Sequence, residues 1–444
     1  MTSALLTDLY QLTMLQGYWH EGMEETAVFE LFVRKFPPRR NFLLAAGLEQ
    51  AIEYLENLAF EQQEIAYLRQ TGLFDDRFLD RLAGLTFSGD VDAMPEGTVF
   101  FPNEPILRVV APLPQAQLVE TRLINLLQFQ TLIASKAARC VLAAPGKNLV
   151  DFGLRRAHGS EAGILAARAA YLAGFGGSSN VAAGMKFSIP VFGTMAHSYI
   201  MAHDDELAAF RGFALSQPQN VVLLIDTYDT LAAVDKVIAL AGELAQRNIP
   251  VKAVRIDSGD LATLAKEVRK KLDAAGLRQT GIFASGDLDE YTLQRFNAQN
   301  APIDGFGVGT RLTTSSDAPY LNCAYKLQEY AGIPRRKVSS GKQTWPGRKQ
   351  IYRRYDEKGV LAGDILTTAD DAQEGEPLLR PVMRKGKRLH PPESLETIRR
   401  RTAMELECLP ADLKELERES TLTVEISTAL RELTRQTDLR LGLI

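Results

Sequence analysis

Six short apolar runs recur between residues 148 and 308, and they restrict the possible folds more than any other feature of this chain. The runs occupy residues 148–152, 188–192, 221–225, 251–256, 281–284 and 303–308, and stretches with helical periodicity lie at 231–247, 261–275 and 288–298. Alternation of buried strands with helices is typical of a parallel sheet. A repeat of about thirty residues, with this number of units, favours a (β/α) barrel over an open sheet.

Residues that could bind ligands or take part in catalysis follow these runs, at the points where the strands should end. The first run is followed by Arg155, the second by Thr194 and His197, the third by Asp226, the fourth by Asp257, Ser258 and Gly259, the fifth by Ser285 and Gly286, and the sixth by Gly309 and Thr310; Arg255 lies within the fourth run. Parallel strands bring their carboxyl ends to one rim, where ligands bind. The sequence therefore predicts one site built from residues far apart in the chain.

The chain before residue 146 lacks this alternation. Strand-rich segments at 27–33 and 91–111 are separated by predicted helices at 42–55 and 60–82, and a long helix is predicted from 115 to 143, before Pro145 and Gly146. We expect an α+β domain over residues 1–145 and the α/β barrel over 146–335. A third segment, 336–444, should pack back on the N-terminal domain. It contains a basic stretch, KVSSGKQTWPGRKQIYRR at 337–354, followed by short β-like pieces and charged helices.

Several functional classes lack their sequence signals in this chain. A formal net charge of -4 gives no basic excess for nucleic acid. The patterns GxxxxGK[ST] and GxSxG are absent, and no GxGxxG opens a helix after the first strand. Cys140, Cys323 and Cys408 fit a reducing cytosol and give no zinc-site spacing. No run approaches membrane-spanning length and the N-terminus lacks a signal-peptide pattern, so we expect a soluble, cytoplasmic protein without a membrane or nucleic-acid partner.

The predicted rim combines cations, carboxylates, a histidine and backbone donors. Two arginines and the basic stretch supply positive charge, while Asp226 and Asp257 suit hydroxyl groups or a metal ion. Glycines alternate along the last run, at Gly305, Gly307 and Gly309, and would let a ligand phosphate approach the backbone closely. A phosphorylated sugar that carries a metal ion fits this mixture.

Seven segments resemble motifs of nicotinate phosphoribosyltransferase, a type II phosphoribosyltransferase. They are TDLYQLTM at 7–14, DFGLRRAHG at 151–159, GGSSNVAAG at 176–184, GTMAHS at 193–198, RIDSGDL at 255–261, GFGVGT at 305–310, and the basic stretch with its pattern KxSxxKxTxPGxKQ. The motifs occur in the family's order and cover most of the chain, from Thr7 to Arg353. Several long motifs in one order make a chance resemblance very improbable.

The resemblance implies a fold and a reaction. The family combines an α/β barrel, which need not be complete, with an N-terminal α+β sandwich completed by C-terminal segments, and works as a homodimer with shared active sites. Its members join nicotinate to 5-phosphoribosyl 1-diphosphate, giving nicotinate mononucleotide and diphosphate in a salvage route to NAD. ATP is hydrolysed in this ligase-type reaction through a phosphorylated histidine, which corresponds to His197. Mg²⁺ is expected to accompany the diphosphate.

The resemblance also implies roles for individual residues. Catalysis would depend on His197, Asp257 and Arg255. Nicotinate would be held by Tyr10 of the neighbouring subunit and by Phe152, Asn180, Thr194 and Arg255. The sugar diphosphate would contact Arg155, Ser198, Asp226, Ser258, Gly259, Ser285, Gly286, Gly309, Thr310, Lys337, Lys342 and Lys349.

Three alternatives stay open at this point. A nicotinamide phosphoribosyltransferase has an aspartate at the position that resembles Asn180, and a carboxylate there would repel nicotinate, so the neutral Asn180 favours the acid. A quinolinate phosphoribosyltransferase should be shorter and should carry more arginines at the site. A sugar-phosphate-binding barrel without activity is disfavoured by the presence of His197, Arg255 and Asp257.

Overall fold

A computed structural model describes residues 3–444, which separate into two compact units. One, here called the sandwich unit, comprises Met1–Ser135 and Tyr320–Ile444; the other, the barrel unit, comprises Lys136–Pro319. The first boundary lies within a helix, α6 (Glu120–Ala143). The sequence placed its boundaries at residues 145 and 335, somewhat later in the chain than these divisions.

The sandwich unit is organised around a seven-stranded antiparallel sheet with the order β13-β12-β1-β5-β3-β17-β18. Its strands are β1 (Thr26–Val33), β3 (Asp90–Ala93), β5 (Pro105–Pro112), β12 (Cys323–Tyr330), β13 (Ile333–Pro334), β17 (Arg380–Arg384) and β18 (Lys387–Arg388). β1 is buried after its first residue and pairs with β5 on one side and β12 on the other. C-terminal segments thus complete the N-terminal sheet, as the resemblance implied.

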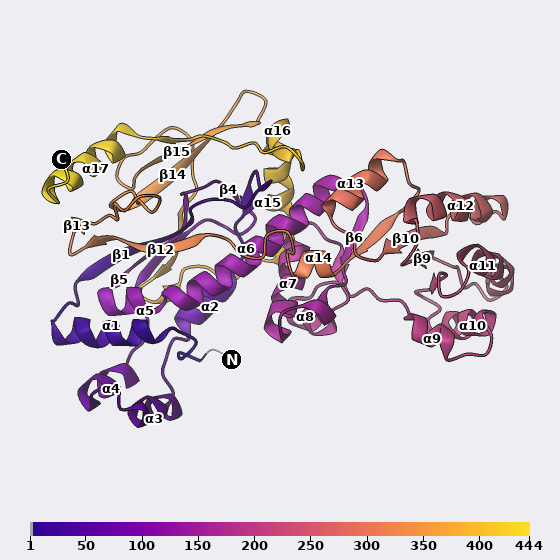
Figure 1. The fold of residues 1–444 in the computed structure, drawn as a ribbon, viewed down its shortest axis with the longest axis horizontal. Helices are drawn as coiled ribbons and strands as arrows, with labels where there is room; N and C mark the ends of the chain where they lie inside the picture. The colour runs from indigo at the N-terminus through magenta and orange to yellow at the C-terminus, as the bar shows by residue number, and fades with distance from the viewer. Residues whose placement is uncertain (1–2) are drawn as a thin grey trace. The chain divides into compact units, whose positions relative to one another are not determined.

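Helices lie on one side of this sheet and a second sheet lies on the other (Figure 1). α5 (Leu113–Leu118) packs on β1 and β5 and is covered by α1 (Leu9–His20). The second sheet has the order β16-β14-β15-β19. The other elements of the two sides and their connections are β14 (Lys349–Tyr355), β15 (Leu361–Thr368), β16 (Glu376–Pro377), β19 (Val424–Ile426), β2 (Leu43–Leu44), β4 (Val99–Phe100), α2 (Leu48–Glu56), α3 (Gln62–Thr71), α4 (Asp76–Ala83), α15 (Leu395–Cys408), α16 (Ala411–Lys414) and α17 (Thr428–Arg440).

A buried ion pair joins β14 to β15. Arg353 and Asp364 face each other in register, and both side chains are at most 1 % exposed. The guanidinium donates to the two carboxylate oxygens at 3.0 and 2.6 Å, and its third nitrogen donates to Glu405 of α15 at 2.8 Å. One guanidinium therefore links two strands and a helix, and losing Asp364 would leave this buried charge with Glu405 as its remaining partner.

The barrel unit contains six parallel strands in the order β7-β6-β11-β10-β9-β8. They are β6 (Asn148–Asp151), β7 (Gly177–Ser178), β8 (Val222–Leu224), β9 (Ala253–Ile256), β10 (Gly281–Ser285) and β11 (Gly305–Val308). A single bridge between Ser178 and Val191 extends the sheet beyond β7. Within residues 3–444 no ladder joins Val191 to β8, so the barrel is incomplete at that point, as the resemblance allowed.

The predicted buried strand at 188–192 is therefore wrong except for that bridge. Ile189 is buried, but 51 % of Val191 is exposed. Pro190 has no N–H to donate to a ladder, and its carbonyl already lies so close to Gly177 that a Cβ there would be 2.2 Å away. The backbone approaches β7 at one place and then leaves it.

Two predicted helices also differ from the structure. Residues 42–55 form β2 and then α2, because Leu43 and Leu44 are buried against β4 and Gly47, with φ 98°, turns the chain before the helix begins. Residues 115–143 form two helices, α5 and α6. The break predicted within 60–82 is confirmed, since Gly72 ends α3 with φ 66°.

Aspartate caps fix where the helices of the barrel unit begin. Asp205, Asp229, Asp260 and Asp289 each accept the N–H of the third residue that follows. The helices are α7 (Ser160–Leu172), α8 (Val181–Phe187), α9 (His197–Met201), α10 (Glu206–Ser216), α11 (Thr230–Ala245), α12 (Leu261–Ala274), α13 (Glu290–Ala298) and α14 (Thr310–Thr313), with a 3₁₀ turn η1 (Leu154–Arg156). Asp229, Asp260 and Asp289 each follow a strand by four or five residues, so the short loops between strand and cap carry predicted site residues at fixed positions.

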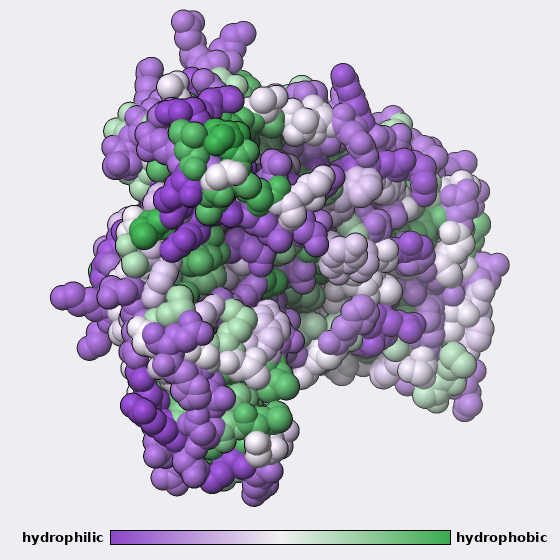
Figure 2. Space-filling view, turned by 60° about the vertical axis from the view of Figure 1, so that its left-hand side comes forward, coloured by the Kyte–Doolittle hydropathy of each residue, from purple (hydrophilic) through white to green (hydrophobic). Residues whose placement is uncertain are grey.

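The surface is mixed in character. The face in Figure 2 is mostly hydrophilic, with hydrophobic residues in separated groups. Large apolar side chains that are exposed include Tyr10, Met185, Met404 and Ile444. Among the described residues, no helix combines the length and the apolar character needed to cross a membrane.

The Arg353–Asp364 pair gives a test of the sandwich unit. We expect Asp364→Asn to lower the free energy of unfolding by about 3 kcal/mol, because it breaks a buried pair. Glu425→Gln removes the same charge from the Glu425–Arg354 pair, whose side chains are 57 % and 43 % exposed, and should cost about 0–1 kcal/mol. Urea unfolding of both variants checks this; equal losses would contradict the role given to the buried pair.

Candidate active site

Two adjoining cavities lie at the carboxyl ends of the parallel strands of the barrel unit. Their volumes are about 350 and 440 Å³, and Phe152, Arg155, Arg255 and Asp257 line both. The first cavity is also lined by Ser179, Thr194, Met195 and His197, and the second by Ser285, Gly286, Gly307, Gly309 and Thr310. Residues from the ends of β6, β7, β9, β10 and β11 therefore meet at one rim, as the sequence predicted.

The guanidinium of Arg255 is the most connected group in this site. It donates to the Ser285 hydroxyl at 2.8 Å, to the Thr194 hydroxyl at 3.0 Å and to Asp257 Oδ1 at 2.8 Å. Its carbon also lies 5.4 Å from the centre of the Phe152 ring. Since guanidinium is planar and its contacts come from three other segments, its orientation is fixed before any ligand arrives.

Asp257 is held in its ionised form. Burial raises the pKa of this carboxyl, but hydrogen bonds from Ser285 and Arg255, together with the positive charge of Arg255, outweigh burial and lower the pKa below its ordinary value. Asp257 Oδ2 lies 3.9 Å from Nε2 of His197. The rim therefore keeps one carboxylate charged beside both a guanidinium and an imidazole.

The ring of Phe152 forms an apolar floor beneath the two cavities. A Cβ added at Gly307 would lie 2.4 Å from this ring, so only glycine leaves the ring its place. Phe283 lies beyond it, with ring centres 5.8 Å apart. An aromatic surface with a cation nearby suits a flat, anionic ring.

Asp151, the residue directly before Phe152, links the ends of β6 and β7 and was not predicted from the sequence. Its carboxylate accepts the Gly153 N–H at 2.8 Å and the Ser178 hydroxyl at 2.7 Å. Burial raises the pKa of Asp151, and these hydrogen bonds oppose the rise without cancelling it. A buried acid at the end of β6, directly before Phe152, was the available signal, because such a group needs partners.

His197 is oriented by Thr227, a second residue that the sequence reasoning missed. Nδ1 of His197 lies 3.1 Å from the Thr227 hydroxyl oxygen, and Nε2 lies 4.0 Å from Asp226 Oδ1. Thr227 follows Asp226 directly in the loop after β8, so a hydroxyl next to a strand-end carboxylate was the signal. The imidazole presents Nε2 toward the two carboxylates.

Asp226 organises the loop after β9 rather than lining a cavity. Its Oδ2 accepts the Asp257 N–H at 3.0 Å and the Ser258 hydroxyl at 2.6 Å. Its Oδ1 is buried and has no hydrogen-bond partner among the described residues. That oxygen lies 4.0 Å from Nε2 of His197, so the buried carboxylate faces the imidazole.

Most of the residues predicted for this site line the two cavities: Phe152, Arg155, Thr194, His197, Arg255, Asp257, Ser285, Gly286, Gly309 and Thr310. Ser198, Ser258 and Gly259 are exposed next to rim residues. Tyr10, Lys337 and Lys342 belong to the sandwich unit and are exposed, and their part in the site stays a prediction.

The role expected for Asn180 is not supported by its geometry. Its side chain is 1 % exposed; the oxygen accepts the Ala183 N–H that begins α8, and the amide nitrogen donates to the Gly163 carbonyl at 3.1 Å. Both ends of the amide are occupied by the protein. Its neighbour Ser179 lines the cavity instead. The structure therefore encloses Asn180 and exposes the preceding residue of the motif to the cavity.

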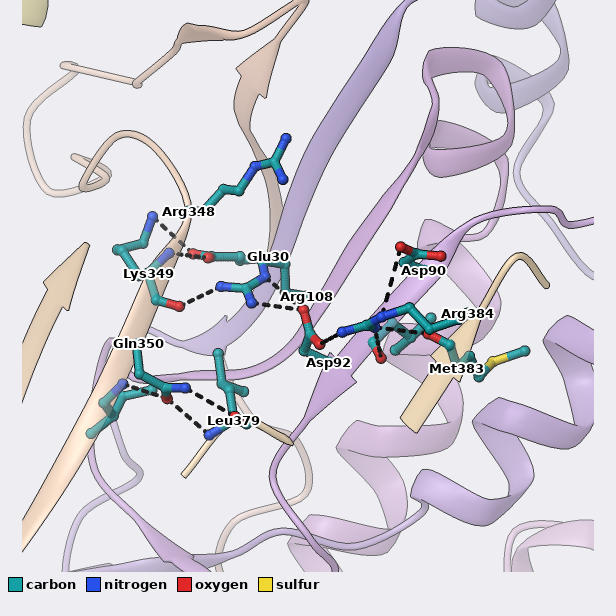
Figure 3. Close-up of polar contacts among 12 residues, drawn as sticks. Glu30, Asp90, Asp92, Arg108, Arg348, Lys349, Gln350, Leu379, Met383 and Arg384 are labelled. Carbon is teal, nitrogen blue, oxygen red and sulfur yellow. Dashed lines mark hydrogen bonds and ion pairs between the residues drawn. The ribbon is translucent and has the colours of Figure 1, made fainter. Parts of the chain in front are cut away.

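Lys349 is also placed differently from the expectation that it binds diphosphate. It is 3 % exposed and lies inside the sandwich unit, where its ammonium pairs with Glu30 at 2.8 Å (Figure 3). Burial lowers the pKa of Lys349, and the Glu30 carboxylate opposes this without cancelling it. An ammonium enclosed in this way is not available to a substrate.

A larger cavity, of about 790 Å³, lies in the sandwich unit beside α15. Two of the arginines that line it have carboxylate partners: Arg380 pairs with Glu376 and Arg401 with Glu393. Its lining does not converge on one point as the rim residues do on Arg255. The barrel rim is therefore the candidate active site.

The protein alone offers few ligands for a metal ion. Within residues 3–444 no cluster of three or more His, Cys, Asp or Glu side chains has a geometry that could hold one. Asp226 and Asp257 supply two carboxylates, and the free Oδ1 of Asp226 is oriented toward His197. This donor set fits an ion that shares its coordination with a phosphate-bearing substrate.

Comparison with known proteins extends over nearly the whole chain. The profile of the nicotinate phosphoribosyltransferase N-terminal domain matches residues 5–128, that of the nicotinate phosphoribosyltransferase family matches 147–333, and that of its C-terminal domain matches 371–434. A nicotinate phosphoribosyltransferase of Mycobacterium tuberculosis is 51 % identical over 416 residues, covering 93 % of this chain and 89 % of the relative. One from Bacillus subtilis is 43 % identical, covering 85 % and 78 %.

A solved structure agrees with these sequence relatives. The human nicotinic acid phosphoribosyltransferase matches with a TM-score of 0.88 at 30 % identity, over 97 % of this chain and 99 % of that one. Both the rim geometry and the extent of these matches lead to one conclusion: the chain belongs to the nicotinate phosphoribosyltransferase family.

Proposed function

We propose that this protein transfers the phosphoribosyl group of 5-phosphoribosyl 1-diphosphate to nicotinate, forming nicotinate mononucleotide and diphosphate for NAD synthesis by salvage. The observation that carries the proposal is the fixed guanidinium of Arg255 beside the ring of Phe152. Together they offer an aromatic surface for a pyridine ring and a planar cation for its carboxylate. Relatives that bear this name at 43–51 % identity support the substrate assignment.

The chemistry requires positioning more than proton transfer. The pyridine nitrogen donates its lone pair to C1 of the ribose, the bond from C1 to the diphosphate oxygen breaks, and that oxygen leaves with the bonding electrons. No proton must be removed from the nucleophile, so no strong general base is needed. The transition state resembles an oxocarbenium ion, which the rim stabilises by holding both reactants and by anionic groups nearby.

Individual residues divide this work. Arg255 and Thr194 orient nicotinate over Phe152, while Asp257 and the Asp226 loop accept hydrogen bonds from the ribose hydroxyls. Ser285, Gly286, Gly309 and Thr310 supply hydroxyl and N–H donors to the 5′-phosphate, with Arg155 as a nearby cation. At Gly286, φ 104° and a Cβ position 2.1 Å from the Asp257 carbonyl leave room for no other residue. Backbone donors there can approach a phosphate closely.

Mg²⁺ belongs to this proposal as an ion carried by the diphosphate. Asp257, which lines both cavities, is the carboxylate of this chain that would contact it, and the buried Asp226 would add negative charge nearby. When bound, such an ion neutralises charge on the leaving diphosphate.

ATP coupling is proposed to act through His197. Its Nε2 is turned toward Asp226 and Asp257, while Thr227 holds Nδ1. A phosphorylated imidazole would add about two negative charges at the rim. That charge would attract ammonium groups such as those of Lys337 and Lys342, and hydrolysis would release them. ATP hydrolysis would therefore speed substrate binding and product release rather than the transfer of the phosphoribosyl group itself.

A homodimer with shared sites completes the proposal. Tyr10, which is 47 % exposed on α1, would supply the second face of the pyridine sandwich from the partner subunit. The likeness to the family supports this arrangement. We expect the protein to be located in the cytoplasm.

The proposed reaction gives a direct test with purified protein. Diphosphate release from 5-phosphoribosyl 1-diphosphate should depend on nicotinate and be much slower with nicotinamide or quinolinate. Arg255→Ala should lower kcat/KM for nicotinate about a hundredfold, because a hydrogen bond to a charged group contributes about 1.5–3 kcal/mol. Equal use of nicotinamide and nicotinate would favour a nicotinamide phosphoribosyltransferase. If none of the three bases supports diphosphate release, the protein binds a sugar phosphate without transferring it.

Selection of the acid over the amide should depend on Ser179. We expect Ser179→Asp to lower kcat/KM for nicotinate at least about tenfold, because it places a carboxylate in the cavity that receives the substrate's own carboxylate. Nicotinamide, which is neutral, should not suffer this loss. Steady-state assays with both bases measure the ratio.

Asn180→Asp is the matched control for that variant. It keeps the helix cap but loses the donor to Gly163, so it should lower the free energy of unfolding by about 1–3 kcal/mol and leave the ratio of the two bases unchanged. A changed ratio in Asn180→Asp, with none in Ser179→Asp, would restore the role first expected for Asn180.

Phosphorylation of His197 is tested with γ-labelled ATP. Wild-type protein should acquire acid-labile label, and His197→Ala should lose the label and the stimulation by ATP while keeping slow transfer at saturating substrate. His203→Ala serves as control, because His203 lies in the same unit and its Nδ1 contacts the Tyr199 carbonyl instead. Absence of label from wild type would rule out the phosphohistidine.

A further inference from the structure

The basic loop at 335–348 ends at Lys349, whose ammonium is buried among oxygen atoms of the protein. Lys349 contacts the Glu30 carboxylate, the Trp345 carbonyl and the Gly347 carbonyl, each at 2.8 Å. Two of the three N–H groups of the ammonium donate to carbonyls of the loop itself, at Trp345 and Gly347. The Glu30 carboxylate of β1 lies beside the ammonium as its ion-pair partner.

Glu30 binds Lys349 a second time through the backbone. One oxygen of this buried carboxylate meets the ammonium, and the other accepts the Lys349 N–H at 2.9 Å. The Lys349 carbonyl in turn accepts from Arg108 at 2.6 Å. The N–H, the carbonyl and the side chain of one residue are therefore all held by the face of the seven-stranded sheet.

These contacts belong to a row of alternating charges across that sheet (Figure 3). Glu30 of β1, Arg108 of β5 and Asp92 of β3 lie opposite one another in register. Arg108 and Asp92 pair at 2.7 Å, and Arg384 continues the row at 2.8 Å from Asp92. Burial raises the pKa of Asp92, but the two guanidinium groups outweigh it and hold that pKa below its usual range. The row is a rigid, charged platform for Lys349.

The base of the loop is fixed while its tip is exposed. The Gln328 carbonyl of β12 accepts the N–H groups of Arg335 and Gly347 at 2.7 and 2.9 Å. Lys337 and Thr344 close the loop across its neck, with two hydrogen bonds of 3.0 Å. Residues 338–343 project beyond this neck, and Lys342 is exposed among them.

We propose that Lys349 is a positioning residue that fixes the base of the basic loop through Glu30, so that the tip presents Lys342 to a diphosphate group. The inference rests on the proposed function for the ligand, but the anchoring itself is a property of the sandwich unit alone. Lys349 then acts on diphosphate binding indirectly, through the loop, rather than as a ligand of the diphosphate. Glu30, although it is an anion, becomes one of the residues needed for binding a polyanion.

Glu30→Gln separates a direct electrostatic role from an anchoring role, because the two predict opposite changes in the affinity for diphosphate. Loss of an anion should strengthen the binding of diphosphate or leave it unchanged if only charge matters. If the loop base loosens, the dissociation constant of magnesium diphosphate, measured by calorimetry, should rise about tenfold, which is about 1.4 kcal/mol. Lys349→Met should produce the same rise. In both variants the amides of residues 345–349 should exchange hydrogen faster.

Two control variants make the test specific. Asp90→Asn removes the same charge near the far end of the row, where Asp90 Oδ2 lies 3.8 Å from Arg384 Nε, and should change neither the affinity nor the exchange of the loop. Lys342→Ala removes a cation from the tip and should weaken diphosphate binding without faster exchange at 345–349. The Glu30→Gln, Lys349→Met double variant removes both buried charges and serves if a single variant does not fold.

The outcomes decide the inference. Weaker binding in Lys349→Met with unchanged exchange, and unchanged binding in Glu30→Gln, would make Lys349 a ligand. Faster exchange without weaker binding would make the clamp purely structural, and either result overturns the proposal. Calorimetry and exchange need no turnover, so a wild-type protein that binds magnesium diphosphate but transfers no phosphoribosyl group would refute the proposed function while leaving the anchoring decided separately.

Discussion

The pairing of β6 with β11 is the constraint on which the site depends. Residues 148–151 lie in register with 305–308, so the first and last strands of the barrel unit become neighbours. That pairing brings the Phe152 ring against Gly307, and β9 then places Arg255 above the same ring. The loops after the strands are held by aspartate caps a few residues later, which leaves the rim little freedom. Preorganisation of this kind suits a reaction whose main demand is the placement of two reactants.

The sandwich unit depends on buried charge to a similar degree. Arg353 and Lys349 both lie on β14, and both are enclosed with carboxylates: Asp364 for the first and Glu30 for the second. Burying ions is costly unless each is paired and hydrogen-bonded, so such pairs specify one arrangement of the strands more than they stabilise it in general. In this chain the Asp364 pair joins two strands of the second sheet, and the Glu30 pair fixes a C-terminal strand on β1 of the N-terminal sheet, and with it the base of the basic loop.

Much of the barrel rim could be predicted because short segments of sequence are enough to locate the ends of the strands. A buried run followed by a polar residue predicts a strand end, and parallel strands share one rim, so Arg255, Asp257, Ser285 and Thr194 were placed together correctly. The residues that were missed, Asp151 and Thr227, act through contacts with groups distant in sequence. The expected contacts of Asn180 and Lys349 with substrate are not seen, since a motif gives the position of a polar side chain but not its partners.

The sequence by itself determined the alternation of strands and helices, the position of the rim and the family. These follow from periodicity, from capping residues and from motifs, which are properties of short segments. Only the tertiary structure decided where the barrel stays open, since the segment at 188–192 makes one bridge to β7 and no ladder to β8 among the described residues. It also decided which charged residues face a ligand and which are enclosed by the protein. Burial and hydrogen-bond partners depend on segments hundreds of residues apart, as Glu30 and Lys349 illustrate, and no local pattern encodes them.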